Sequence, residues 1–402
     1  MLKDQQQTYT KSDFVIPIAY ALEQKASIAL YRLPGETRIN LLVDFSEYPK
    51  SFKRPLEDYD KGFLIVPFDR GSEKHLLHPD LYLNNEDPVM DQVEDHSKLD
   101  MSLKEELVRR IEQNASADHL PFHETAFESS KENEDWFHNY VSEGVSMIKS
   151  GQLHKVVPSR TKDVQIDPKL NKLALFNALC SAYPNAFVSL ISTSKFGTWV
   201  GASPEILVKS TQKHFFSTMA LAGTKAYDEE LGLNEVLWSQ KEIEEQALVS
   251  RYIINCFKKI RLREFEEIGP RTVRAGNLVH LRTDYKVDME ATAFPELTST
   301  MLELLHPTSA VCGMPREKAR QFIETHEPFE RKLFAGYFGP VNIENNTYCF
   351  VNLRCMSFHE GQIRLYAGAG LTADSKPERE LRETELKFET LKNILDQLNA
   401  LV

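Results

Sequence analysis

Two carboxylates and one ammonium group fall close together on a predicted helix near the C-terminus, in the stretch YAGAGLTADSKPERELRETELK. Pro377 suits the first turn of a helix, and Ser375 is placed to cap it. On that helix Glu380, Glu383 and Lys387 follow one another at spacings of three and four, so they share one strip of surface. A solvated helix face has the same spacing, so spacing alone leaves a binding site and a surface ion pair both open.

A second predicted helix carries a similar pair of acids. In SQKEIEEQ, Glu242 and Glu245 are three apart, while Lys241 and Glu245 are four apart and suit an ion pair. The acids of the C-terminal helix differ because they lie beside an apolar stripe and follow AGAG, whose small residues let the backbone approach a ligand. Two glutamate pairs without His or Cys favour a hard divalent ion, Mg²⁺ rather than zinc. The stripe consists of Phe388, Leu391, Leu395 and Leu398.

Single polar residues in apolar, strand-like surroundings form the third group of candidates. Lys155 lies in HKVVPSR and Glu205 in GASPEIL. Burial can make a lysine neutral, as a general base requires, and can keep a glutamic acid protonated, as a general acid requires. In TYCFVNLRCM, Asn352 and Arg354 are predicted to share one strand face, where an arginine either binds a carboxylate or lies at the rim. Each residue type is also common at strand edges, so none decides the function alone.

Other motifs are weaker. His280 in LVHLRT and His306 in LHPTSA are of a kind that is more often structural than catalytic. The chain has no GxSxG nucleophile elbow and no phosphate loop, and GAGLTA lacks the third glycine of a dinucleotide motif.

The scaffold predicted for these residues is α+β, with largely antiparallel sheets and helices packed on them. A hairpin is expected over 26–43, a strand meander over 186–224 and a long helix over 233–259, while 71–134 is polar and read as a loose connection or insertion, with order returning at Ser130. Further strands are expected at GFLIVPFD, QLHKVVPSR, VHLRTDYKVDM, AGYFGPVNI, TYCFVNLRCMSF and QIRLYAGAG, and helices at SLKEELVRRIEQ, ENEDWFHNYVSEGVSMIKSG and TSTMLELLHP.

Charge and cysteine usage narrow the function classes. The 48 basic and 59 acidic residues give a net charge of −11, which disfavours a broad surface for nucleic acid or an anionic membrane. The five cysteines form no CxxC pair, so neither a disulfide framework nor a zinc site is expected, and a reducing compartment fits. The N-terminal residues show no apolar signal core, and the longest apolar runs are too short to cross a bilayer. A cytoplasmic protein is therefore expected.

Taken together, nine segments resemble the chorismate-utilising enzymes, which comprise isochorismate, anthranilate, aminodeoxychorismate and salicylate synthases. They lie in the family's order between Trp136 and Leu398. The resemblance implies one α/β sandwich over 1–402, with 1–130 as its less recognisable N-terminal part and 135–398 as the chorismate-binding catalytic region. The segments are HKVVPSR, GASPEIL, ALAGT, SQKEIEEQ, HLRT, LHPTSAVCGMPREKA, EPFERKLFAGYFGP, VNLRC and GAGLTADSKPERELRETELK.

The resemblance assigns roles to the opening motif. It implies Mg²⁺ bound directly by Glu245 and Glu383 and through water by Glu242 and Glu380, with the ring carboxylate of chorismate on the metal. Lys387 corresponds to a lysine at that carboxylate. The implied substrate-binding set is Gly223 and Gly368, which approach through the backbone, Arg354 with Tyr337 or Tyr366 at the enolpyruvyl carboxylate, and Thr224, His280, Ala310 and Val311.

Within the family, the resemblance favours the isochorismate reaction, an isomerisation in which water attacks carbon 2 and the 4-hydroxyl leaves. The family's base corresponds to Lys155 and its acid to Glu205, whereas ammonia-using anthranilate synthases carry glutamine at the lysine position. Aminodeoxychorismate synthases carry a lysine where this chain has Ala222, and Ala310 resembles the water-using enzymes. Pro158, Glu242 and Gln246 depart from the family's usual residues.

Rival interpretations remain open from sequence. A salicylate synthase adds pyruvate elimination in the same pocket, an aminase uses ammonia, and a non-catalytic metal-binding or regulatory module keeps only the fold. We expect a small-molecule enzyme that acts without nucleic acid, membrane or amidotransferase subunit, as a monomer or weak dimer. Its product would serve menaquinone or siderophore biosynthesis.

Overall fold

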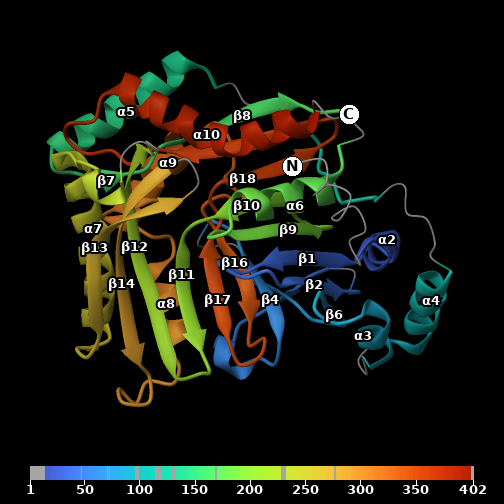
Figure 1. Ribbon diagram of the computed structural model, residues 1–402. Helices are drawn as coiled ribbons and strands as arrows, with labels where there is room; N and C mark the ends of the chain where they lie inside the picture. Colours follow the sequence, from blue (N-terminus) through green and yellow to red (C-terminus); the bar gives the residue numbers. More distant parts are fainter. Residues whose placement is uncertain are drawn as a thin grey trace.

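The computed structural model is built on two large sheets that face each other (Figure 1). This confirms the predicted α+β class with largely antiparallel sheets, because every strand pair within the sheets is antiparallel. The structure describes residues 14–46, 48–69, 71, 73–95, 99–113, 120–128, 132–167, 170–227, 232–275 and 278–399. The predicted return of order at Ser130 lies outside these residues.

The eight-stranded sheet is buried on both faces. On its strand β1, Ile28 and Leu30 pack toward one apolar cluster and Ala29 and Tyr31 toward another, which follows from the alternation of side chains along a strand. The strands lie in the order β6 (Leu81–Asn84), β2 (Ile39–Asp44), β1 (Ser27–Arg32), β9 (Phe187–Thr193), β10 (Gly197–Ser203), β18 (Cys355–His359), β19 (Gln362–Gly368) and β8 (Ser159–Gln165).

The nine-stranded sheet closes the core between the two sheets. Phe187 of the first sheet stacks on Phe350 of the second at a ring-centroid distance of 4.1 Å. Its strands lie in the order β13 (Glu266–Ala275), β14 (Leu278–Asp288), β12 (Phe215–Ala226), β11 (Ile206–Thr211), β17 (Thr347–Val351), β16 (Tyr337–Val341), β4 (Gly62–Val66), β5 (His75–Leu77) and β3 (Lys50–Ser51). A separate two-stranded sheet pairs β15 (Gly313–Met314) with β7 (Lys155–Val156).

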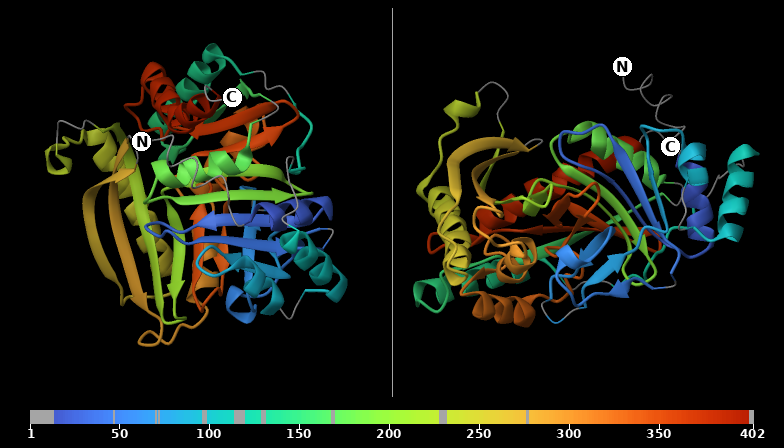
Figure 2. Two further views of the ribbon diagram at one scale, coloured as in Figure 1. Left: turned by 45° about the vertical axis from the view of Figure 1, so that its right-hand side comes forward. Right: turned by 90° about the horizontal axis from the view of Figure 1, so that it is seen from below.

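Helices cover the outer faces and one side of the molecule (Figures 1 and 2). Helices α6 and α10 contact the eight-stranded sheet, α7 and α8 contact the nine-stranded sheet, and α2, α3 and α4 gather at one side. The helices are α2 (Val15–Glu23), α3 (Val89–Asp95), α4 (Met101–Glu112), α5 (Glu134–Lys149), α6 (Lys172–Ala182), α7 (Gln240–Lys259), α8 (Leu297–Leu305), α9 (Arg316–His326) and α10 (Pro377–Asn399), with single 3₁₀ turns at η1 (Leu56–Asp58) and η2 (Leu233–Glu235).

Three segments that the sequence predicts as single strands are each split in the structure. TWVGASPEILVKS breaks at Pro204 and Glu205, and its halves β10 and β11 belong to different sheets. TYCFVNLRCMSF breaks between β17 and β18, so Asn352 and Arg354 lie in the connection and do not share a strand face. Pro204 has no N–H to donate to a strand ladder, which favours the break after β10. Arg354 has a left-handed φ of 49°, which interrupts the extended backbone between β17 and β18. HKVVPSR breaks at Pro158 into β7 and β8.

Other boundaries also differ from the sequence prediction. The helix expected over 233–259 begins at Gln240, because Ser239 and Glu242 form a capping box there. Strand β13 was not predicted at all. The segment 71–134, expected to be loose, supplies β5 to one sheet and β6 to the other. The predicted helices at α4, α5 and α8 are confirmed.

Candidate active site

Helices α7 and α10 are linked through buried charges. Lys241 of α7 reaches across to Glu380 of α10, with Nζ 2.7 and 3.0 Å from the two carboxylate oxygens, and lies 3.6 Å from Glu383. Glu383 also pairs with Lys387 at 2.7 Å, and Lys387 donates to the carbonyl of Gly368. The sequence paired Lys241 with Glu245 on its own helix. It missed this inter-helix pair because spacing along one helix carries no information about the other.

Burial and neighbouring charges shift the pKa values of Glu380 and Glu383 in opposite directions. Burial raises the pKa of Glu380, and the neighbouring Glu383 carboxylate adds to this despite the opposing Lys241 ammonium. Burial alone would also raise the pKa of Glu383, but the ammonium groups of Lys387 and Lys241 bring it below its ordinary value. Glu383 therefore keeps its negative charge to a lower pH than Glu380 does.

Glu245 lies at the junction of α7, β7 and the AGAG turn. Its Oε1 accepts a 2.9 Å hydrogen bond from the ammonium of Lys155, which is fully buried. A Cβ atom added to Gly370 would lie 2.2 Å from the same oxygen. The small-residue turn thus allows the backbone to approach the carboxylate of Glu245, and its expected approach to a ligand stays a prediction.

Glu242 is turned toward its own helix end. Its carboxylate accepts hydrogen bonds from the backbone and hydroxyl of Ser239, and Lys225 lies 3.7 Å away. Gly223, at a bulge in β12 with φ 72°, leaves room for this side chain, because its missing Cβ would be 3.0 Å from the Cβ of Glu242. No described contact connects Glu242 with Glu245, Glu380 or Glu383.

The glutamates fit a hard divalent ion by chemistry. Carboxylate oxygens are the ligands that Mg²⁺ prefers, and the glycine at position 370 keeps the backbone turn close to Glu245. The ammonium groups of Lys155, Lys241 and Lys387 now balance these carboxylates. Among the described residues, no three His, Cys, Asp or Glu side chains gather closely enough to hold a metal ion.

Glu205 occupies the connection between β10 and β11. Its side chain is 5% exposed, and burial raises its pKa to about 8, with the charges of Lys155 and Arg354 acting in the opposite direction. Its backbone is fixed, because its carbonyl accepts from the N–H of Val351 at 3.0 Å and its N–H donates to Ser203. At neutral pH this carboxyl group is protonated.

Arg354 lies in the other connection between the sheets. Burial lowers its pKa to about 10, and the charges of Glu383, Tyr183 and Glu205 act against that shift. The same residue lines a cavity of about 470 Å³ that also reaches Tyr183. Arg354 therefore lines the cavity and is also influenced by the charges of Glu383 and Glu205.

His280 presents one ring nitrogen without a partner. Its Nδ1 is 3.0 Å from the carbonyl of Gly223 and 3.3 Å from the hydroxyl of Thr224, whereas its buried Nε2 has no hydrogen-bond partner among the described residues. Burial lowers its pKa to about 3, and the positive charge of Arg354 adds to this, so the ring is neutral. The carbonyl fixes the proton on Nδ1, which makes Nε2 an acceptor.

A buried ion pair that the sequence did not single out holds two segments near Lys155. Arg331 pairs with Glu327, each with a 2% exposed side chain, and donates to the carbonyls of Val157 and Val311. Glu327 in turn accepts from the N–H of Ser159 at 3.0 Å. The pair therefore holds the break between β7 and β8 against the loop that carries Ala310 and Val311. The adjacent charges in EPFERK, at i and i+4, are the one signal for it in the sequence.

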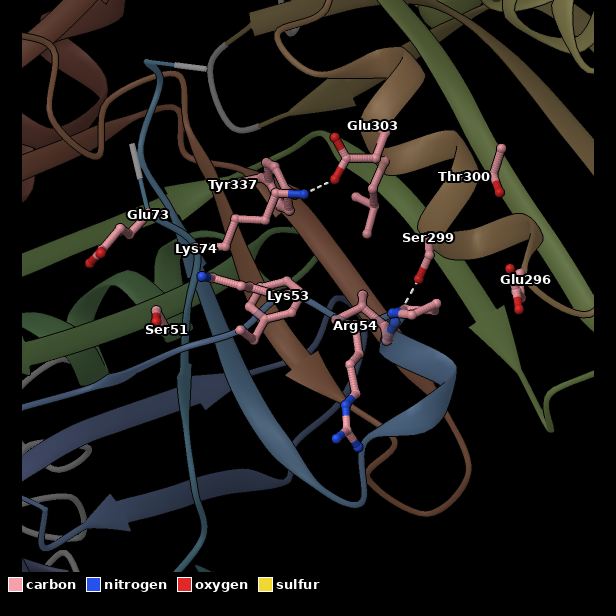
Figure 3. Close-up of a pocket in the computed structure, with 14 residues that line it drawn as sticks. Ser51, Lys53, Arg54, Glu73, Lys74, Glu296, Ser299, Thr300, Glu303 and Tyr337 are labelled. Carbon is pink, nitrogen blue, oxygen red and sulfur yellow. Dashed lines mark hydrogen bonds and ion pairs between the residues drawn. The ribbon is translucent and has the colours of Figure 1, made fainter. Parts of the chain in front are cut away.

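The two candidate tyrosines make their described contacts elsewhere. The ring of Tyr337 packs on His306 and lines a different cavity of about 450 Å³, beside the Lys74–Glu303 ion pair (Figure 3). Tyr366 stacks on aromatic core residues, and its hydroxyl lies 3.0 Å from that of Ser357. The tyrosine whose charge interacts with Arg354 is Tyr183, which the sequence did not indicate. His306 is structural as expected, with Nε2 3.1 Å from the carbonyl of Pro67.

Comparisons with known proteins identify the family of the chain. A family model described as "Chorismate binding enzyme" matches residues 54–396. The isochorismate synthase EntC of Escherichia coli K12 is 31% identical over 264 residues, or 64% of this chain and 66% of EntC. DhbC of Bacillus subtilis, also an isochorismate synthase, is 34% identical over 268 residues, or 63% of this chain and 66% of DhbC. The matches thus span just under two thirds of these relatives.

Solved structures extend the likeness to nearly the whole chain. DhbC of Bacillus anthracis has a TM-score of 0.69 at 26% identity, covering 94% of this chain and 98% of that one. The menaquinone-specific isochorismate synthase MenF of Escherichia coli has a TM-score of 0.72 at 22% identity, covering 96% and 92%, which supports the fold. No helix among the described residues is long and apolar enough to span a membrane.

Proposed function

Because the chain belongs to the chorismate binding enzyme family, we propose that it is an isochorismate synthase, an isomerase that converts chorismate to isochorismate. Water adds at carbon 2, the ring double bonds shift and the 4-hydroxyl leaves. The observation that carries this proposal is a buried lysine, Lys155, whose charge acts on a second buried group, the carboxyl of Glu205, whose pKa burial raises to about 8. Two relatives, EntC and DhbC, carry the same named activity.

The two residues divide the proton transfers. Glu205 donates its proton to the departing 4-hydroxyl, which its raised pKa supports at neutral pH. To act as a base, the ammonium group of Lys155 must first release the proton that it now donates to Glu245 in a hydrogen bond. The neutral amine then accepts a proton from the attacking water. In the reverse direction the roles exchange, with Glu205 as base and Lys155 as acid.

The glutamates of α7 and α10 suit a Mg²⁺ cofactor. We assign Glu245 and Glu383 as direct ligands, with Glu242 and Glu380 acting through water. These residues would hold the ion, which would supply positive charge to the substrate's ring carboxylate. Glu242 has to leave its cap on Ser239 to take part.

The remaining residues orient a dianionic substrate. Lys387 and Arg354 would supply local positive charge to the substrate in a protein whose net charge is −11. The Nε2 of His280, which has no partner among the described residues, offers an acceptor for a substrate hydroxyl. We assign the backbone at Gly223 and at Gly368 to contacts with the same substrate. Thr224, Ala310 and Val311 complete the walls.

We place the enzyme in the cytoplasm, without an amidotransferase subunit, as a monomer or weak dimer. Its five cysteines carry free thiols, four of them buried, which fits a reducing compartment. The names of the relatives support either a menaquinone or a siderophore pathway for the product.

The direct test is incubation with chorismate and Mg²⁺, with the products separated by chromatography. Isochorismate as the main product is expected. Salicylate with pyruvate as the main products would replace the proposal with a salicylate synthase, and no conversion at all would favour a non-catalytic member. The Glu205→Gln variant is the control for background conversion.

A further inference from the structure

Arg160 joins an edge strand of the eight-stranded sheet to helix α10. It lies on β8, opposite Ala367 of β19, and the next residue of β19 is Gly368, whose carbonyl accepts from Lys387 of α10. Helix α10 runs beside β8 and α5 (Figure 1). The side chain of Arg160 is 14% exposed. It follows Lys155 by five residues, so one segment of chain carries both side chains.

The guanidinium group of Arg160 makes three contacts with α10. Its Nη1 donates to the hydroxyl of Thr384 at 3.2 Å, and its Nη2 pairs with Glu385 at 2.7 Å. The guanidinium carbon lies 5.2 Å from the ring centroid of Phe388, one turn further along the helix, and 5.8 Å from that of Phe137 on α5. One planar group therefore holds both helices to β8.

Thr384 is the contact of Arg160 that lies nearest in the chain to the assigned metal ligands. It is fully buried, directly follows Glu383 and lies one helical turn after Glu380. Its hydroxyl donates to the carbonyl of Leu381 at 2.7 Å, so the oxygen is left to accept from Arg160. Because residues of one helix keep fixed directions relative to each other, a contact that fixes Thr384 also fixes the directions of the two glutamates.

Contacts at three points of a helix fix both its rotation about its axis and its position along that axis. Groups that bind a metal ion must be held within about 0.5 Å and about 10–20° of their working geometry. A helix rises about 1.5 Å and turns about 100° per residue, so even a partial slip of α10 exceeds this limit. The ion pairs with Lys241 and Lys387 are less restrictive, because an ammonium group on a flexible stem has no fixed orientation.

We propose that Arg160 is a positioning residue that acts through Thr384: it sets the rotation and axial position of α10 and so places Glu380 and Glu383 for a divalent ion. The inference rests on the proposed function, in which these glutamates serve Mg²⁺. Arg160 itself is assigned no contact with the ion or the substrate. Because β8 follows the strand of Lys155 across a short break, the same side chain also keeps α10 aligned with the segment that carries the proposed base.

The test compares Arg160→Met with Lys162→Met by calorimetric titration with Mg²⁺. Lys162 is the matched control, because it lies on the same strand, pairs with the same Glu385 at 2.7 Å and lies 5.9 Å from the centroid of the same Phe388 ring, while no described contact joins it to Thr384.

The expected result differs in sign from a simple effect of charge. Each variant loses one positive charge, and that loss alone would strengthen the binding of a cation. Arg160→Met should instead weaken Mg²⁺ binding by about tenfold, as is typical when a residue that orients metal ligands is removed. Lys162→Met should leave Mg²⁺ binding unchanged or slightly stronger.

Further variants separate the shape of the guanidinium group from its charge. Arg160→Lys keeps the charge but not the planar fork, so it should bind Mg²⁺ as weakly as Arg160→Met. Thr384→Val replaces the hydroxyl by a methyl group and should weaken binding by a similar factor. The double variant Arg160→Met/Thr384→Val should bind no more weakly than Arg160→Met, because both changes break the same contact. Circular dichroism and thermal unfolding check folding, and if Arg160→Met does not fold, Thr384→Val carries the test.

Equal Mg²⁺ affinities for Arg160→Met and Lys162→Met would overturn the positioning role, and so would full affinity in Arg160→Lys or Thr384→Val. Failure of the proposed function gives a different result. If the unmodified protein binds Mg²⁺ but does not convert chorismate, the activity is wrong, and the affinities still decide the role of Arg160. If it binds no Mg²⁺, the metal assignment is wrong, and amide hydrogen exchange of α10 must then be faster in Arg160→Met than in Lys162→Met, since equal rates would overturn the role.

Discussion

At the scale of single residues, Glu205 has to hold a proton that an ordinary glutamate would have lost. Its pKa of about 8 in the folded chain exceeds its value in an unfolded chain, so the folded state binds the proton more tightly. The protonated form stabilises the fold fully below pH 4.5, and that contribution is lost as pH rises to about 8.

The first prediction concerns Glu205→Gln. We expect kcat to fall at least about a hundredfold, in both reaction directions, because a general acid typically contributes ~10²–10⁴ in rate. The forward rate of the unmodified enzyme should decline as pH rises through about 8, and its thermal stability should fall relative to the glutamine variant from about pH 5 to 8. A variant with near-normal turnover in either direction would remove Glu205 from the mechanism.

The second prediction concerns Lys155→Ala. The residue is fully buried against Glu245, so its loss removes the base and leaves that carboxylate without its ammonium partner. We expect kcat to fall at least about a hundredfold while Mg²⁺ still binds in calorimetry. Lys149→Ala, at an exposed position on α5, is the control and should retain full activity.

At the scale of elements, α7 and α10 carry the four glutamates that we assign to Mg²⁺, and this assignment makes the third prediction. A chelator should abolish turnover, and added Mg²⁺ should restore it. Glu245→Ala or Glu383→Ala should abolish turnover even with excess Mg²⁺, because each removes a proposed ligand. Glu244→Ala, on the exposed side of α7, is the matched control. Full activity in excess chelator would refute the metal assignment.

The fourth prediction concerns the Arg331–Glu327 pair, which joins the β7–β8 break to the loop at Val311. Arg331→Met leaves the carboxylate of Glu327 buried without its cationic partner, so the free energy of unfolding should fall by about 3–5 kcal/mol. Arg320→Met removes a surface pair with Glu317 and Glu324 on α9 and should change stability by about 1 kcal/mol at most. Chemical denaturation measures both variants, and equal effects would contradict the role of the buried pair.

The sequence predicted which helices and strands form better than it predicted where one strand ends and the next begins. Helical periodicity located α4, α5, α8 and α10, and apolar alternation located most strands. Alternation did not reveal that the two halves of a strand belong to different sheets, because the side-chain pattern within each half carries no information about which sheet it joins. The hydroxyl of Ser375 was expected to cap α10, but it accepts from the N–H of Thr372.

The candidate site was foreseen in its residue types and only partly in its contacts. The resemblance pointed to Lys155, Glu205 and the acidic helices, and the structure shows Lys155 on Glu245 and Lys241 on Glu380, while the roles of these residues stay predictions. It could not place Lys241 between Glu380 and Glu383, or turn Glu242 toward Ser239, because such contacts depend on the packing of distant segments. Tyr183 was not predicted as a neighbour of Arg354, because nothing in its local sequence distinguishes it from other tyrosines.

At the scale of the whole molecule, the choice of water over ammonia makes the fifth prediction. With ammonium salts and chorismate, the enzyme should form no anthranilate and no aminodeoxychorismate, because Lys155 is placed to deprotonate water. Product analysis by chromatography, with and without ammonium, checks this. An aminated product formed at a rate comparable to isochorismate would show that the nucleophile is assigned wrongly.

Glu205 and Arg354 both sit in the short connections through which the chain passes from one sheet to the other. These connections are shared by both sheets, so any shear of one sheet against the other moves the two side chains before either hydrogen-bonded ladder opens. Turnover should therefore be sensitive to small displacements of one sheet against the other. Under heat or pressure, activity should be lost while circular dichroism still reports intact strands.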